Sequence, residues 1–191
     1  TNGDFNLIKS NKYEIVVNNI KYKLSDNLIG HHNYSNAAAA IAVCSQLKIS
    51  INKQIKSLES FKGVQKRMEF IGEFKGIKIY DDFAHHPTAI KAAIAAVNNK
   101  YKNQKLLTIF LPNSNSMHLG THDDRLMSSL KSSKYVLIIT KSRRLKKLFQ
   151  NNIKINVIEC KSQIGDYLFS NNCFDNILIL SNKNTKDIIE Y

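Results

Sequence analysis

The sequence predicts a mixed α/β protein: a Rossmann-like, mainly parallel sheet with helices on both faces, preceded by a smaller part made of a hairpin and helices. From residue 70 onward, short apolar strand-like segments alternate with segments of helical length, which is typical of parallel sheets. Near the start, two strand-like segments flank Asn18-Asn19. Because 43% of the 191 residues are apolar, the chain can also form a substantial core.

The first part is predicted to contain a β-hairpin over residues 13–17 and 20–24, because Asn18-Asn19 suits a tight two-residue turn. A helix rich in alanine opens at Gly30, and a second helix covers about residues 52–61. Gly63 and the charged residues after it indicate a domain boundary. We therefore expect domains at residues 1–65 and 66–191.

The second part begins with two strands around a turn at Lys75-Gly76 and then alternates helices and strands. No glycine-rich dinucleotide motif is present, so the prediction concerns fold class alone. Strands are predicted at residues 70–74, 76–80, 106–111, 135–140, 155–158 and 177–180, and helices at 88–97, 125–130, 143–149, 164–169 and 186–189.

Composition limits the function classes. The formal charge is +13, but 24 of the 28 basic residues are lysines scattered without aromatic interleaving, beside many asparagines, as in a low-GC coding bias. We therefore expect no nucleic-acid partner, and an anionic small molecule fits the charge at least as well. Three cysteines without metal-type spacing indicate free thiols, and no signal peptide or membrane span is evident, which favours a cytoplasmic protein without a membrane partner.

The densest group of ionisable residues lies at residues 80–89, where a strand runs into Asp81-Asp82-Phe83-Ala84-His85-His86-Pro87 and then a helix. Open α/β folds bind ligands at this kind of strand end. Two further segments have two interpretations each. His32, Asn33 and Asn36 either cap a helix or belong to a site where side-chain amides bind a planar ligand, and Arg67 is either an exposed structural residue or a phosphate ligand.

Three motifs in this order resemble the Mur ligase family, the ATP-dependent amide-forming ligases of peptidoglycan synthesis. They are Gly30-x-His32-Asn33-x-x-Asn36, then Arg67-Met68-Glu69, then the segment from Asp81 to Pro87. The resemblance implies that residues 1–65 correspond to the end of a central ATPase domain and residues 66–191 to the C-terminal domain. A uridine-nucleotide domain and a phosphate loop are not found in the sequence, so the resemblance predicts a fragment that is inactive alone.

The resemblance also implies site residues. ATP is expected to be held by His32, Asn33 and Asn36 at adenine, Arg67 at phosphate and Asp82 at ribose, with Mg²⁺ held mostly elsewhere in the enzyme. The resemblance places His85 and His86 near the amine substrate; the alternative is that one caps the next helix and the other packs beneath it. No metal site is expected, because neither histidine has zinc-ligand spacing with a third partner.

Phe83, Ser181-Asn182 and the loop after Pro112 resemble the members that join the tripeptide L-Ala-γ-D-Glu-meso-diaminopimelate to UDP-N-acetylmuramate in peptidoglycan recycling. Asn113, Ser114 and Asn115 are then the expected peptide-binding residues. Asn113 stands where these members usually have Arg, and Lys183-Asn184 where they usually have two glycines. The alternatives are the members that add L-alanine, or a binding module without catalysis.

Overall fold

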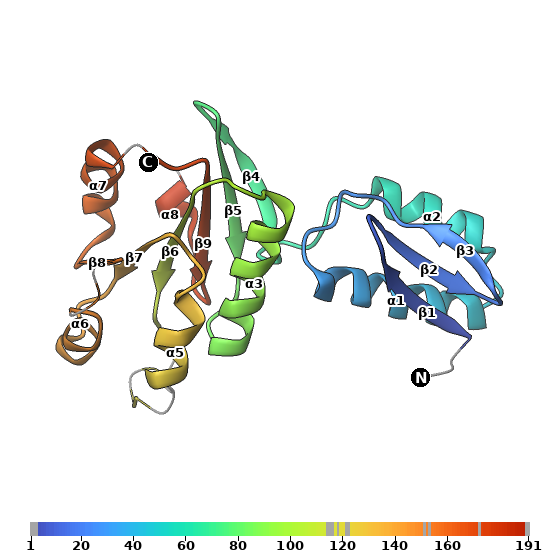
Figure 1. Ribbon diagram of the computed structural model, residues 1–191, viewed down its shortest axis with the longest axis horizontal. Coiled ribbons are helices and arrows are strands. Elements are labelled where there is room, and N and C mark those ends of the chain that lie inside the picture. Colours follow the sequence, from blue (N-terminus) through green and yellow to red (C-terminus); the bar gives the residue numbers. More distant parts are fainter. Residues whose placement is uncertain are drawn as a thin grey trace. The chain divides into compact units, whose positions relative to one another are not determined.

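The computed structural model describes residues 4–113, 117, 119–120, 123–150, 152, 154–171 and 173–189. Internal contacts divide the chain into two compact units, one ending at Gly63 and the other beginning at Val64. Each unit is described by itself below, and Figure 1 shows the elements of both.

The first unit contains a three-stranded antiparallel sheet in the order β1-β2-β3, with strands β1 (Phe5–Lys9), β2 (Tyr13–Val17) and β3 (Ile20–Lys23). The predicted hairpin is confirmed as β2 and β3. Asn18 and Asn19 both have positive φ, as a tight hairpin turn requires. Strand β1 was not predicted, because its alternation of apolar and polar residues is broken at Leu7-Ile8. It pairs along the whole of β2.

Two helices complete the first unit, α1 (His31–Gln46) and α2 (Ile51–Ser60). One face of α1 is buried through Tyr34, Ala37 and Ile41. Tyr34 and Ile41 pack with Ile15 of β2 in a small apolar core.

The second unit contains a six-stranded sheet in the order β4-β5-β9-β6-β7-β8. Only the β4–β5 pair is antiparallel, which confirms the mainly parallel prediction. The strands are β4 (Glu69–Phe74), β5 (Ile77–Asp82), β6 (Leu106–Leu111), β7 (Tyr135–Ile139), β8 (Ile155–Ile158) and β9 (Asn176–Ser181).

Helices cover both faces of this sheet, as predicted (Figure 1). On one face, Ile164 of α7 and Ile188 of α8 pack on a core of isoleucine and leucine side chains from the strands. On the other face, α3 contacts β6 and β9 and lies beside α5. The helices are α3 (Pro87–Lys100), α5 (Asp123–Leu130), α6 (Arg143–Phe149), α7 (Ile164–Ser170) and α8 (Lys186–Ile189), with a 3₁₀ turn η1 (Lys161–Gln163) before α7.

Strand β5 extends further than predicted. The sequence placed its end at Tyr80, but pairing with β9 continues through Asp81 and Asp82. Successive residues of a strand point to opposite faces, so the two carboxylates lie on different faces of the sheet. Asp81 is on the face of Ile77 and Ile79, which pack with α7 and α8. The carboxyl ends of β5, β6, β7, β8 and β9 share one edge of the sheet.

Candidate functional site

Arg67 lies in a tight turn that leads from Val64 into β4, called here the Arg67 turn (residues 64–68). Its neighbours Lys66 and Met68 both have positive φ. Two hydrogen bonds from the Lys66 backbone hold the turn. The Lys66 N–H donates to the Glu69 side chain at Oε2 over 2.8 Å, and the Lys66 carbonyl accepts from the Phe83 N–H at 2.8 Å. The Arg67 side chain is exposed, and its guanidinium carbon lies 5.9 Å from the centre of the Phe83 ring.

Asp82 is buried and braces the Arg67 turn. Its Oδ2 accepts from the Met68 N–H at 2.8 Å and its Oδ1 accepts from the Ala84 N–H at 2.8 Å. Only 4% of the residue is exposed. Both carboxylate oxygens therefore accept hydrogen bonds from backbone N–H groups of this unit.

Asp81 has a different environment. Its Oδ2 accepts from the Thr185 hydroxyl at 2.6 Å, whereas its Oδ1 is buried without a hydrogen-bond partner among the described residues. Burial raises the pKa of Asp81; the Thr185 hydrogen bond and the Lys66 charge oppose this shift. Asp81 thus ties β5 to the segment that follows β9.

The two histidines differ in exposure. His85 is half-buried, its Nδ1 lies 3.0 Å from the Phe83 carbonyl oxygen, and its ring meets the edge of the Phe83 ring. His86 is exposed at the N-cap position of α3, but its side chain makes no capping hydrogen bond there. The capping alternative is therefore wrong for His86.

The expected adenine residues all lie within α1. The helix begins at His31 with Gly30 as its N-cap, so His32, Asn33 and Asn36 are internal to the helix and the N-capping interpretation is wrong. The Asn33 amide donates to the Ile29 carbonyl at 2.8 Å. Asn36 is exposed, and these residues belong to the first unit, whereas Arg67 and Asp82 belong to the second.

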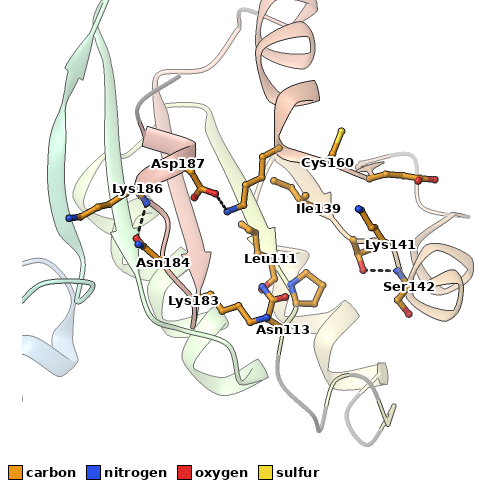
Figure 2. Close-up of a pocket in the computed structure, with 14 residues that line it drawn as sticks. Leu111, Asn113, Ile139, Lys141, Ser142, Cys160, Lys183, Asn184, Lys186 and Asp187 are labelled. Carbon is orange, nitrogen blue, oxygen red and sulfur yellow. Dashed lines mark hydrogen bonds and ion pairs between the residues drawn. The ribbon is translucent and has the colours of Figure 1, made fainter.

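A cleft of about 1110 Å³ opens at the carboxyl ends of β6, β7, β8 and β9 (Figure 2). Its apolar floor includes Leu111 and Ile139, where β6 and β7 end. Asn113, from the loop after β6, and Lys183, from the segment after β9, both line it. Ser114 and Asn115, also expected here, lie outside the described residues.

Positive charge dominates the cleft lining, which includes four lysines and two carboxylates. The two carboxylates are paired: Asp187 with Lys161, and Glu159 with Lys146 of α6. These lysines lower the pKa values of both acids, which keeps them ionised. Among the described residues, Lys141, Lys183 and Lys186 have no carboxylate within ion-pair distance. Figure 2 shows the Lys186 side chain directed away from the cleft, so Lys141 and Lys183 are the ammonium groups that the cleft offers to an anion.

The loop that carries Asn113 is held at its far end by α6. The Arg144 guanidinium donates to the Met117 carbonyl and to Asp123, which begins α5. Gly120 has positive φ, and a side-chain carbon there would come within 3.0 Å of Arg144 Nη1. A larger residue at Gly120 would therefore displace the guanidinium.

The donor set fits an anion better than a metal ion. Within the part of the chain that the structure describes, no three His, Cys, Asp or Glu residues are grouped to hold a metal ion. The exposed guanidinium of Arg67 and the cleft ammonium groups suit phosphate or carboxylate oxygens. None of the described helices is both long enough and apolar enough to cross a bilayer.

Residues 66–174 match the family described as Mur ligase, glutamate ligase domain, so the chain belongs to the Mur ligase family. It is similar to a UDP-N-acetylmuramate–L-alanyl-γ-D-glutamyl-meso-2,6-diaminoheptandioate ligase of Haemophilus influenzae, with 39% identity over 54% of this chain and 23% of the relative. It is also similar to a UDP-N-acetylmuramate–L-alanine ligase of Caldicellulosiruptor bescii, with 38% identity over 69% of this chain and 27% of the relative. The chain thus spans about a quarter of the length of these relatives.

A solved murein peptide ligase of Psychrobacter arcticus aligns with 98% of this chain and 43% of its own, with 28% identity and a TM-score of 0.66. A UDP-N-acetylmuramate–alanine ligase of Thermotoga maritima aligns with a TM-score of 0.79 over 98% of this chain and 44% of its own, and at 19% identity it supports the fold alone. The two kinds of relative leave the amine substrate open.

The lysines of the cleft and the role of Thr185 were not predicted from the sequence. Lys141 and Lys183 each follow a strand of the parallel sheet, so the rule that ligands bind at carboxyl ends of strands could have found them. Thr185 carried no such signal, because its partner Asp81 is 104 residues away in the sequence.

Proposed function

We propose that this chain forms the amine-substrate part of an ATP-dependent Mur ligase and contributes to its nucleotide site. The complete reaction would join an amine-bearing peptide to UDP-N-acetylmuramate through an acyl phosphate. The observation that carries the proposal is the cationic cleft at the carboxyl edge of the sheet in a chain of this family. In open α/β folds this edge is the usual place for a ligand.

In this mechanism, ATP converts the substrate carboxylate into an acyl phosphate, which the incoming amine displaces. Arg67 is proposed to meet the phosphates, because a guanidinium matches phosphate oxygens and lowers the energy of charge that develops during transfer. Asp82 is proposed to act on the nucleotide mainly by fixing the Arg67 turn, since both its oxygens already accept backbone N–H groups. His32, Asn33 and Asn36 remain the proposed adenine contacts.

The cleft favours the tripeptide over L-alanine as the amine substrate. L-Ala-γ-D-Glu-meso-diaminopimelate carries several carboxylates, whereas L-alanine carries one. Lys141 and Lys183 can bind two carboxylates together, while Asn113 can donate one amide hydrogen bond at the position where an Arg is usual. His85 and His86 are proposed to border the path of the amine.

The test has two parts. Calorimetry of the 191-residue chain should show saturable binding of the tripeptide and binding of L-alanine at least about tenfold weaker, because fewer carboxylates meet the lysines. Lys141→Met should weaken tripeptide binding, and Lys75→Met, at the β4–β5 turn, should leave it unchanged.

The second part uses the longest polypeptide that carries this chain in its native reading frame. With UDP-N-acetylmuramate and ATP, it should release phosphate faster on addition of the tripeptide than on addition of L-alanine. Stimulation by L-alanine instead would assign the chain to the alanine-adding members. Tripeptide binding without phosphate release under any condition would favour a binding module.

A further inference from the structure

The segment that follows β9, residues 183–185, is called here the β9 loop. On one side it lines the cleft, where Figure 2 shows Lys183 and Asn184. Hydrogen bonds within and around it keep it ordered: the Lys183 N–H donates to Ser181 Oγ at 3.1 Å, and the Thr185 carbonyl accepts from the Ile188 N–H at 2.9 Å, which starts α8. The position of the β9 loop therefore sets where the Lys183 ammonium group can reach.

On its other side, the β9 loop is held by two residues from distant parts of the sequence. Lys66 Nζ donates to the Lys183 carbonyl oxygen. The Thr185 hydroxyl donates to Asp81 Oδ2 at 2.6 Å, and Thr185 and Asp81 are 3% and 2% exposed. A buried hydrogen bond to a carboxylate is among the stronger contacts that a hydroxyl can make.

Lys66 belongs at the same time to the Arg67 turn. Its carbonyl accepts from the Phe83 N–H, its own N–H donates to Glu69, and its ammonium group lies 6.0 Å from the centre of the Phe83 ring, near which the Arg67 guanidinium also lies. One residue thus contacts both the backbone that presents Arg67 and the backbone that presents Lys183.

We propose that Lys66, Asp81 and Thr185 are positioning residues that couple the Arg67 turn to the cleft through the β9 loop. An anion bound at Lys183 would reduce the mobility of the β9 loop. Through the Lys66 and Asp81 contacts, the Arg67 turn would become less mobile as well. Because coupling between two sites is reciprocal, an anion at Arg67 would strengthen binding in the cleft by the same factor. The inference rests on the proposed function for the identity of the two anions and not for the coupling itself.

The first test measures amide hydrogen exchange in the 191-residue chain. Thr185→Val removes the hydroxyl at nearly constant volume, and Thr185→Ser keeps it; Lys66→Met removes the ammonium group, and Lys66→Arg keeps a cationic donor. Exchange at the Lys183 and Ile188 amides should become about tenfold faster or more in Thr185→Val and Lys66→Met, because each loses a hydrogen bond to or from a charged group. Thr185→Ser, Lys66→Arg and the control Lys75→Met should retain wild-type rates.

A second reporter, the Phe83 amide, distinguishes coupling between the two segments from a merely structural role of Lys66. In the wild-type chain, saturating tripeptide should slow exchange of the Phe83 N–H, which donates to Lys66. In Lys66→Met the tripeptide should no longer change that rate, and its Kd should rise about tenfold or less, the range expected for one lost contact. Exchange at the buried Leu178 amide of β9 reports whether the variant still folds.

The outcomes distinguish the two proposals. If the wild-type chain binds no tripeptide but the Lys183 and Ile188 amides respond to Thr185→Val and Lys66→Met, the proposed substrate is wrong and the positioning role stands. If the tripeptide binds but those amides keep wild-type exchange rates in both variants, the positioning role is wrong. A Phe83 amide that responds equally to tripeptide in wild type and in Lys66→Met overturns the coupling.

Discussion

The Arg67 turn and the β9 loop are two irregular segments beside β5, and neighbouring carboxylates of that strand hold them in different ways. Asp82 holds the Arg67 turn through charged hydrogen bonds from the backbone, with both oxygens used. Asp81 holds the β9 loop through one side-chain hydroxyl, and its second oxygen has no hydrogen-bond partner among the described residues. The aspartate of β5 therefore fixes the Arg67 turn at its backbone, whereas β5 reaches the β9 loop through a single side-chain contact, beside the Lys66 bond.

This difference follows from the geometry of a strand. Adjacent residues face opposite sides of the sheet, so a pair of aspartates at a strand end reaches two different loops. A buried carboxylate with two N–H partners has most of its desolvation cost offset, whereas one with a single hydroxyl does not. The Arg67 turn should therefore be the more rigid of the two segments, and the β9 loop the more responsive to ligands and pH.

The largest effect is expected for Asp82→Ala. The change leaves the Met68 and Ala84 N–H groups buried without their acceptor, which should lower the free energy of unfolding of the second unit by about 3 kcal/mol. Global exchange of buried β9 amides measures this loss. Asp82→Asn, which keeps one carbonyl oxygen as acceptor, should lose about half as much. If Asp82→Ala leaves the free energy of unfolding unchanged, the Asp82 hydrogen bonds to the Arg67 turn do not stabilise the second unit.

A smaller effect is expected for Glu69→Ala, which removes the acceptor of the Lys66 N–H. Because Glu69 is only half-buried, water can partly replace it, and the cost should be about 1 kcal/mol. Glu73→Ala on the same strand is the matched control, since Glu73 is exposed and its Lys78 contact is 3.7 Å long. Equal costs for the two variants would show that the Glu69 contact does not hold the turn.

The predictability of these features from sequence depends on how local their causes are. The mainly parallel sheet was predicted because apolar strand segments alternate with helices, and residues 106–111 and 155–158 were predicted to the residue. The continuation of β5 through Asp81-Asp82 was missed because it depends on pairing with β9, which is distant in the sequence. Strand β1 pairs with the neighbouring β2 and was missed because its local pattern is weak.

The candidate site divides in the same way. Asp82, Arg67 and Asn113 could be proposed from local motifs, since each belongs to a short segment with a recognisable pattern. The Lys66 contact with the Lys183 carbonyl and the gathering of Lys141 and Lys183 at one edge could not, because they arise only when segments distant in sequence are brought together. Local sequence motifs indicate which residues are candidates, and the topology of the sheet determines which of these residues lie together.

The smallest expected effect concerns the pH dependence that Asp81 gives to stability. Burial raises its pKa above the unfolded value of 3.8 despite Lys66 nearby, with Glu69 and Asp82 acting in the same direction as burial. The native state thus holds the proton more tightly, so this contribution to stability is complete below about pH 4 and is lost as pH rises through the raised pKa. Asp81→Asn cannot titrate, and its free energy of unfolding relative to wild type should therefore increase with pH across that window.

Thr185→Val sharpens the same measurement. The Thr185 hydrogen bond lowers the pKa of Asp81, so its removal should extend the window to higher pH in a chain that keeps Asp81. Global exchange of β9 amides, measured from about pH 4 to about pH 7 on wild type, Asp81→Asn, Thr185→Val and the double variant, gives the four stability curves. Parallel curves for wild type and Asp81→Asn would show that Asp81 titrates alike folded and unfolded. The two aspartates would then differ in their hydrogen-bond geometry alone and not in their electrostatic environment.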